Sequence, residues 1–80
     1  MRTLAEHRWE AERLTGLAMA AYDRGLDAAT LPLGGGELLT LTRVGLGCTA
    51  APLGAIRLCT YWMAYLEIDG FLRARFPGDS

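Results

Sequence analysis

The side chains with reactive chemistry are few and scattered along the chain. There is one histidine, His7, and there are two cysteines, Cys48 and Cys59. A zinc site needs ligands at close, regular spacing, and a nucleophilic cysteine needs a base that a third group orients. These residues form neither pattern. We therefore expect a protein that is not an enzyme and that holds no cofactor and no metal.

The three candidate residues also have simpler structural interpretations. His7 falls on the apolar side of its predicted helix, which favours a packed, hydrogen-bonded histidine. Cys59 lies inside a second predicted helix and Cys48 just before it, a separation too large for an easy disulfide. Cys59 is then a buried thiol. The N-terminus does not resemble a signal peptide, so we expect reduced thiols in a cytoplasmic protein.

Two glycine-rich stretches resemble nucleotide-binding loops only superficially. Gly34-Gly35-Gly36 lacks the Lys-Ser/Thr of a P-loop, and no strand–helix–strand unit fits around Gly45-Leu46-Gly47. The net charge is −1, from eight arginines and nine acidic residues. That balance gives no general electrostatic case for binding nucleic acid or an anionic membrane.

The first predicted helix runs from Thr3 to about Arg24. Thr3 and Glu6 fit a capping box, in which each side chain bonds the backbone of the other residue. Gly25 followed by Leu26 is typical of a Schellman ending, where glycine takes the left-handed conformation.

Residues 37–44 are ambiguous between two structures. Leu39 to Val44 alternates between apolar and polar residues, which favours a hairpin of Ala29–Leu33 with Leu38–Val44 across the glycines. The other interpretation is a short helix, with Glu37 in its first turn. The Val44-Gly45-Leu46 stretch resembles the ending at Arg24-Gly25-Leu26, and on that ground we predict the helix.

A long helix is predicted from Thr49 to Phe76, with Pro52 in its first turn and Pro77 after its end. It is apolar nearly all round. One row contains Ile56, Cys59, Met63 and Leu66, and a neighbouring row contains Leu58, Trp62, Tyr65 and Leu72. Only a narrow strip through Arg57, Thr60, Ala64 and Glu67 is polar or small. Such a helix is buried on several sides, which one partner helix cannot achieve.

The whole chain, residues 1–80, is expected to be a single domain, and one that associates with itself. The hydrophobic fraction is 51% and the mean hydropathy +0.17, both high for so small a chain. Excess apolar surface on a small protein usually ends in an oligomer interface. We therefore predict a homodimer with the Thr49–Phe76 helices at its core.

A contact surface for a partner is predicted at both helices. Trp9 lies on the far side of the first helix from its apolar stripe, beside the small residues Gly16 and Ala20, an arrangement typical of an interface anchor. The remaining candidates belong to the long helix: Tyr61, Trp62, Tyr65, Arg73 and Arg75.

The predicted fold is all-α: a small antiparallel helical hairpin or three-helix domain, with helix–β-hairpin–helix as the alternative. The predicted function is a cytoplasmic protein-interaction module that acts as regulator, adaptor or inhibitor of a larger partner. Its composition suits a bacterial or phage accessory protein. A ligand-binding or accessory subunit of an enzyme, with an apolar pocket near Cys59 and His7, is one alternative. Helical DNA-binding and membrane association are others, although residues 50–56 offer no base-reading side chains and Arg57 would interrupt a membrane span.

Overall fold

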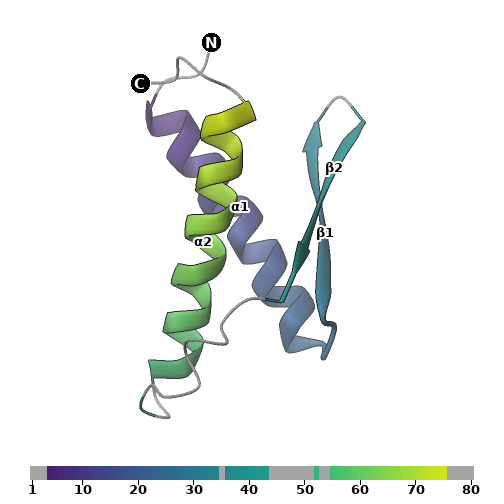
Figure 1. Cartoon of the computed structure of the whole chain (residues 1–80), viewed down its shortest axis with the longest axis vertical. Coiled ribbons are helices and arrows are strands. Elements are labelled where there is room, and N and C mark those ends of the chain that lie inside the picture. Colours follow the sequence, from purple (N-terminus) through teal and green to yellow (C-terminus); the bar gives the residue numbers. More distant parts are fainter. Residues whose placement is uncertain (1–3, 35, 44–51, 53–54, 76–80) are drawn as a thin grey trace.

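The computed structural model describes residues 4–34, 36–43, 52 and 55–75. Its elements are helix α1 (Leu4–Asp23), strand β1 (Ala28–Gly34), strand β2 (Glu37–Thr42) and helix α2 (Ile56–Arg75). The hairpin and α2 both pack on α1, which α2 crosses (Figure 1), and Arg75 at the end of α2 pairs with Glu37 of β2. The all-α prediction is therefore wrong. The alternative arrangement, helix–β-hairpin–helix, is the one observed.

Helix α1 ends as its sequence predicts. Gly25 has a φ of +86°, and its N–H donates to the carbonyl oxygen of Tyr22 at 2.9 Å. The N–H of Leu26 donates to the carbonyl oxygen of Ala21 at 3.2 Å. These two bonds define the Schellman ending, and glycine adopts the left-handed conformation without a Cβ clash. The predicted cap, Thr3, lies outside the described residues.

Residues 37–42 form a strand and not the predicted helix. β1 and β2 are antiparallel, with Ala29 opposite Leu41 and Leu31 opposite Leu39. In a strand, Leu39 and Leu41 share one face, and here that face packs on α1. In a helix the same two residues would lie about 200° apart and could not both face the core. Tertiary packing therefore decides this segment.

Helix α2 begins at Ile56, later than the predicted start at Thr49, which lies outside the described residues. Just before the helix, the N–H of Ala55 donates to the carbonyl oxygen of Pro52 at 2.8 Å. Pro52 therefore precedes the helix and does not occupy its first turn. The described helix ends at Arg75, close to the predicted end at Phe76.

The core is small and centred on α1. From α2 only Ala64, Ile68 and Leu72 are fully buried in it. The radius of gyration is 13.1 Å, whereas a compact domain of this length has about 11.6 Å. The chain measures 40 × 24 × 16 Å along its principal axes. Helix α1 is thus covered on two sides and α2 on one, which leaves much of α2 exposed.

Candidate functional site

Large apolar side chains gather on the side of α2 that faces away from the core. Leu58 is 60% exposed, Trp62 54%, Met63 40% and Leu66 58%. Positions 58, 62 and 66 follow one another at helical spacing, and position 63 lies beside them. We call these four residues the α2 face. In the single chain they contact water where a soluble protein usually has polar side chains.

Part of the strip that the sequence marks as polar or small lies on the core side of α2, although Arg57 and Glu67 at its edges are exposed. Ala64 is completely buried there, and Thr60 is half-buried. Ala64 has almost no side chain, so α1 can approach the backbone of α2 closely at this point. Ile68 and Leu72 continue the buried stripe along the helix. Leu58, Trp62, Met63 and Leu66 of the apolar rows consequently point outward.

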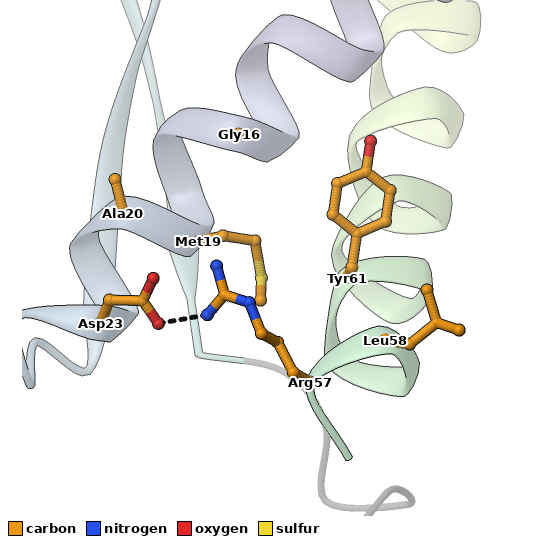
Figure 2. Close-up of a pocket in the computed structure, with 7 residues that line it drawn as sticks. All are labelled: Gly16, Met19, Ala20, Asp23, Arg57, Leu58 and Tyr61. Atoms are coloured by element: carbon orange, nitrogen blue, oxygen red, sulfur yellow. Dashed lines mark hydrogen bonds and ion pairs between the residues drawn. The ribbon is translucent and has the colours of Figure 1, made fainter. Parts of the chain in front are cut away.

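A groove lies between α1 and α2 where the two helices diverge. It has a volume of about 460 Å³, and its lining is mainly apolar. Figure 2 shows Met19 of α1 and Tyr61 of α2 between the two helices, with an ion pair bridging them at one end. The residues that line the groove are Gly16, Met19, Ala20, Asp23, Arg57, Leu58 and Tyr61. Leu58 belongs to both the groove and the α2 face.

The ion pair at the end of the groove joins Asp23 of α1 to Arg57 of α2. The hydrogen bond that Arg57 donates lowers the pKa of the Asp23 carboxyl, and the carboxylate in turn raises the pKa of Arg57. Both side chains are exposed. They give an otherwise apolar groove a polar rim of both signs.

Three aromatic side chains connect the groove to the α2 face. The rings of Tyr61 and Tyr65 stack with their centroids 6.5 Å apart. Trp62 meets Tyr65 edge to face, with centroids 5.6 Å apart and planes at 78°. Burial raises the pKa of Tyr65, and the nearby carboxylates of Asp69 and Glu12 raise it further. The groove and the α2 face therefore form one continuous, largely apolar surface.

The structure brings together five of the predicted contact residues. Gly16, Ala20 and Tyr61 line the groove, and Trp62 and Tyr65 adjoin it through their ring contacts. A Cβ built on Gly16 would meet nothing within 4 Å, so the space above this part of α1 is open.

The other three predicted residues lie elsewhere. Trp9 is 76% exposed on the same outward row of α1 as Gly16 and Ala20. Arg73 Nε donates to Asp69 Oδ2 at 2.9 Å, and Arg75 Nη2 donates to both carboxylate oxygens of Glu37 at 2.6 Å. The Arg73 bond lies within α2, whereas the Arg75 bond joins α2 to β2.

The sequence prediction missed several residues of this surface. It placed Leu58, Met63 and Leu66 in the core of a homodimer but not in the surface for a larger partner, and it gave Met19 no role. The four-residue spacing of 58, 62 and 66 does place these residues on one side of a helix. Recognising that side as the outer one requires knowledge of where α1 packs.

His7 and Cys59, proposed together as a ligand site, are not adjacent. His7 is 1% exposed, and its Nε2–H donates to the Asp69 carboxylate at 3.0 Å, which confirms a packed, hydrogen-bonded histidine. Asp69 lies ten residues from Cys59 along α2, about 15 Å. Cys59 is half-buried and disulfide-bonded, so the prediction of a reduced core thiol is wrong. Cys48 lies outside the described residues.

Within the described part of the chain, no group of three or more potential metal ligands gathers at one place. Neither described helix combines the length and the apolar character that a bilayer crossing requires. These features define a small helix–β-hairpin–helix protein with an exposed apolar surface. A scan against protein-family models finds no match, and searches of curated proteins and of solved structures find none either.

Proposed function

We propose that the chain is a small protein-interaction module, a regulator, adaptor or inhibitor of a larger partner. Its contact surface is the α2 face together with the adjoining groove. The observation that carries this proposal is the exposure of four large apolar side chains, 40–60% each, on one side of one helix. Contiguous apolar surface of this kind on a soluble chain is typical of an interaction site.

The exposed area also supports an interaction. A compact monomer of 8.7 kDa exposes about 4,700 Å² of surface. This chain exposes 5290 Å². The excess, roughly 600 Å², approaches the area of about 800 Å² that each partner buries in a standard interface. The four exposed side chains of the α2 face contribute part of this exposed surface.

The shape and chemistry of the surface favour an amphipathic helix as the bound segment. Trp62 supplies a large, rigid anchor, and the small residues Gly16 and Ala20 leave room for a close approach. The Asp23–Arg57 pair offers charges of both signs at the rim, where polar contacts fix orientation. Catalysis forms no part of the proposal because the one histidine is buried and hydrogen-bonded to Asp69.

The disulfide at Cys59 bears on the cellular compartment of the protein. The sequence led us to expect reduced thiols and a cytoplasmic protein, whereas Cys59 is disulfide-bonded. Disulfides persist mainly in oxidising compartments. We therefore attach no compartment to the proposed function.

Photo-crosslinking in the cells that make the protein tests the proposal. A benzoyl-phenylalanine replaces Trp62 in one variant and, as a matched control, Arg24, which is exposed beyond the end of α1. We expect a defined adduct with a larger polypeptide from position 62 only. Adding Leu66→Glu should abolish that adduct while the far-ultraviolet circular dichroism stays unchanged.

Three results would contradict the proposal. One is the absence of any adduct from position 62. The others are an adduct that forms equally from position 24 and an adduct that persists with Leu66→Glu, because such an adduct would not depend on the α2 face.

A further inference from the structure

The two outer edges of the hairpin differ in how they are protected. Unpaired strand edges present rows of backbone donors and acceptors to other chains, and an isolated two-stranded sheet is only marginally stable. Natural proteins often block such edges with proline or with charged residues. β1 carries Pro32, whereas β2 has neither a proline nor a charge between Leu38 and Thr42.

The hydrogen bonds of the hairpin show which groups point outward. The N–H of Arg43 donates to the carbonyl oxygen of Asp27 at 2.6 Å, so odd-numbered positions of β2 bond to β1. In an antiparallel ladder the even-numbered positions, Leu38, Thr40 and Thr42, then direct their backbone groups away from β1. Within the described residues, those groups of Leu38 and Thr40 make no hydrogen bond.

The same alternation explains how Pro32 blocks the edge of β1 at one position. Pro32 lies opposite Leu38, so its nitrogen points away from β2, and the proline ring leaves that position without a donor. Its carbonyl oxygen accepts a hydrogen bond from Arg13 Nη2 at 3.4 Å. A strand from another chain would therefore find no suitable partner groups at this point of β1, but it would find them on β2.

The sequence of β2 is complementary to itself in the antiparallel direction. Glu37 and Arg43 are equally distant from Thr40 and opposite in charge. When two copies of β2 align antiparallel with Thr40 opposite the partner's Thr40, Glu37 lies opposite the partner's Arg43. Leu39 then lies opposite the partner's Leu41. Within one chain Glu37 and Arg43 are about 20 Å apart, at about 3.3 Å per residue, so they can pair only between chains.

We propose that a second copy of this chain pairs with the open edge of β2, which gives a four-stranded antiparallel sheet with a twofold axis at Thr40. The pairing satisfies the outward backbone groups of Leu38 and Thr40, whereas the carbonyl oxygen of Thr42 already accepts a hydrogen bond from the Tyr22 hydroxyl at 3.3 Å. It also extends the apolar strand face that packs on α1, because Leu39 and Leu41 lie on that face. Opposite charges and apolar pairs across neighbouring strands both stabilise a sheet.

This interface is separate from the α2 face. The hairpin and α2 are separate elements that each pack on α1 (Figure 1), and the α2 face points away from the core. A second copy paired with β2 leaves the α2 face to a larger partner, so the pairing does not rest on the proposed function. It places the self-association at β2 and not at the Thr49–Phe76 helices, where the sequence predicted it. Glu37 keeps its bonds to Arg75, and the partner's Arg43 adds a second cation to the same carboxylate.

Light scattering of the whole purified chain across a range of concentrations tests the pairing. We expect the wild type to have the mass of two chains of 8.7 kDa each. Thr40→Pro removes an outward N–H as Pro32 does in β1, so it should give a monomer with an intact hairpin. Glu37→Arg and Arg43→Glu each place like charges opposite one another and should raise the dimer Kd about tenfold or more.

The decisive variant combines the two charge reversals. In an Arg75→Gln background, which removes the intrachain pair with position 37, Glu37→Arg with Arg43→Glu restores opposite charges across the axis and should recover dimerisation, whereas Arg24→Glu, a control reversal elsewhere, should change nothing. The charge series remains decisive even if Thr40→Pro fails to fold. A monomeric wild type, a dimer that resists the single reversals, or a double variant that is weaker than both singles would each overturn the inference.

Discussion

Helices α1 and α2 have the same length but opposite relations to the core. Each has twenty residues. α1 places its apolar residues inside and exposes mainly charged and small ones, apart from Trp9 and Leu17. α2 buries a stripe that starts at a small residue, Ala64, and exposes its bulkiest side chains. The difference shows that position between two packed layers, and not apolar content, determines how much of each helix is covered.

The two helices also differ in how they are held. α1 packs against both the hairpin and α2 through apolar contacts. α2 adds three polar contacts to its narrow apolar stripe: a hydrogen bond of Asp69 with His7, and the ion pairs Arg57–Asp23 and Arg75–Glu37. The second and third are exposed, and exposed pairs contribute little. The attachment of α2 therefore depends mainly on the buried stripe and on His7–Asp69.

The same substitution in both helices gives the largest expected contrast. Leu14 of α1 is completely buried, so Leu14→Ala should destabilise the fold by about 2 to 5 kcal/mol. Leu66 of α2 is 58% exposed, and Leu66→Ala should cost roughly 0.5 kcal/mol or less in the isolated chain. Urea unfolding at one fixed protein concentration measures both values. Equal costs at the two positions would show that the α2 face is covered in the purified protein.

A small residue at the contact between the helices gives the next largest effect. Ala64→Leu inserts a bulky side chain where α1 and α2 approach, and overpacking of this kind costs about 1 to 3 kcal/mol. Ala74→Leu makes the same change at an exposed position of α2 and should be nearly neutral. Thermal unfolding followed by circular dichroism distinguishes them. Two neutral variants would mean that α1 and α2 can separate at little cost.

The sequence predicts α1 well because its signals are local. Gly25 and Leu26 end the helix through bonds to residues only three and five positions away. The segment 37–44 has conflicting local signals, since its alternation favours a strand and its glycine ending resembles a helix stop. Burial of Leu31 and Leu41 against α1 decides the outcome, and that contact is not local in sequence.

The candidate site was predictable only in part for the same reason. The exposure of Trp9 and the small row Gly16–Ala20 follow from the clear periodicity of α1. α2 is apolar nearly all round, so periodicity cannot say which side faces inward. Contacts with distant residues orient it, among them Asp69 with His7 and Arg75 with Glu37, 62 and 38 positions apart in sequence.

The buried contact that anchors α2 should appear in the pH dependence of stability. Burial alone would raise the pKa of Asp69, but hydrogen bonds from Arg73 and His7 hold it below its ordinary value. A carboxyl with a lower pKa in the folded chain stabilises the fold fully above about pH 4 and loses that contribution as the pH falls. Asp69→Asn should lower the free energy of unfolding by about 1 to 2 kcal/mol at pH 7. It should also make the free energy of unfolding fall less steeply as the pH is lowered below about 4.

Urea midpoints between pH 7 and pH 3 measure this effect, and Asp23→Asn is the matched control. The pKa of Asp23 is also lowered, by its hydrogen bond from Arg57, but that pair is exposed and should contribute less. A larger acid effect from Asp23 than from Asp69 would contradict the anchoring role of the His7 contact.

The smallest expected effect is a gain in stability at Gly16, in the groove. Glycine inside a helix costs about 0.5 to 1 kcal/mol relative to alanine, and an added Cβ there meets nothing within 4 Å, so Gly16→Ala should stabilise the chain by that amount. Gly25→Ala, the control, should destabilise it because Gly25 has a φ of +86°. A methyl group at position 16 also occupies part of the groove. If Gly16→Ala stabilises the fold and yet lowers the crosslinking yield from position 62, the partner approaches α1 closely at position 16 and needs glycine at that position. An unchanged yield would restrict the contact surface to the α2 face.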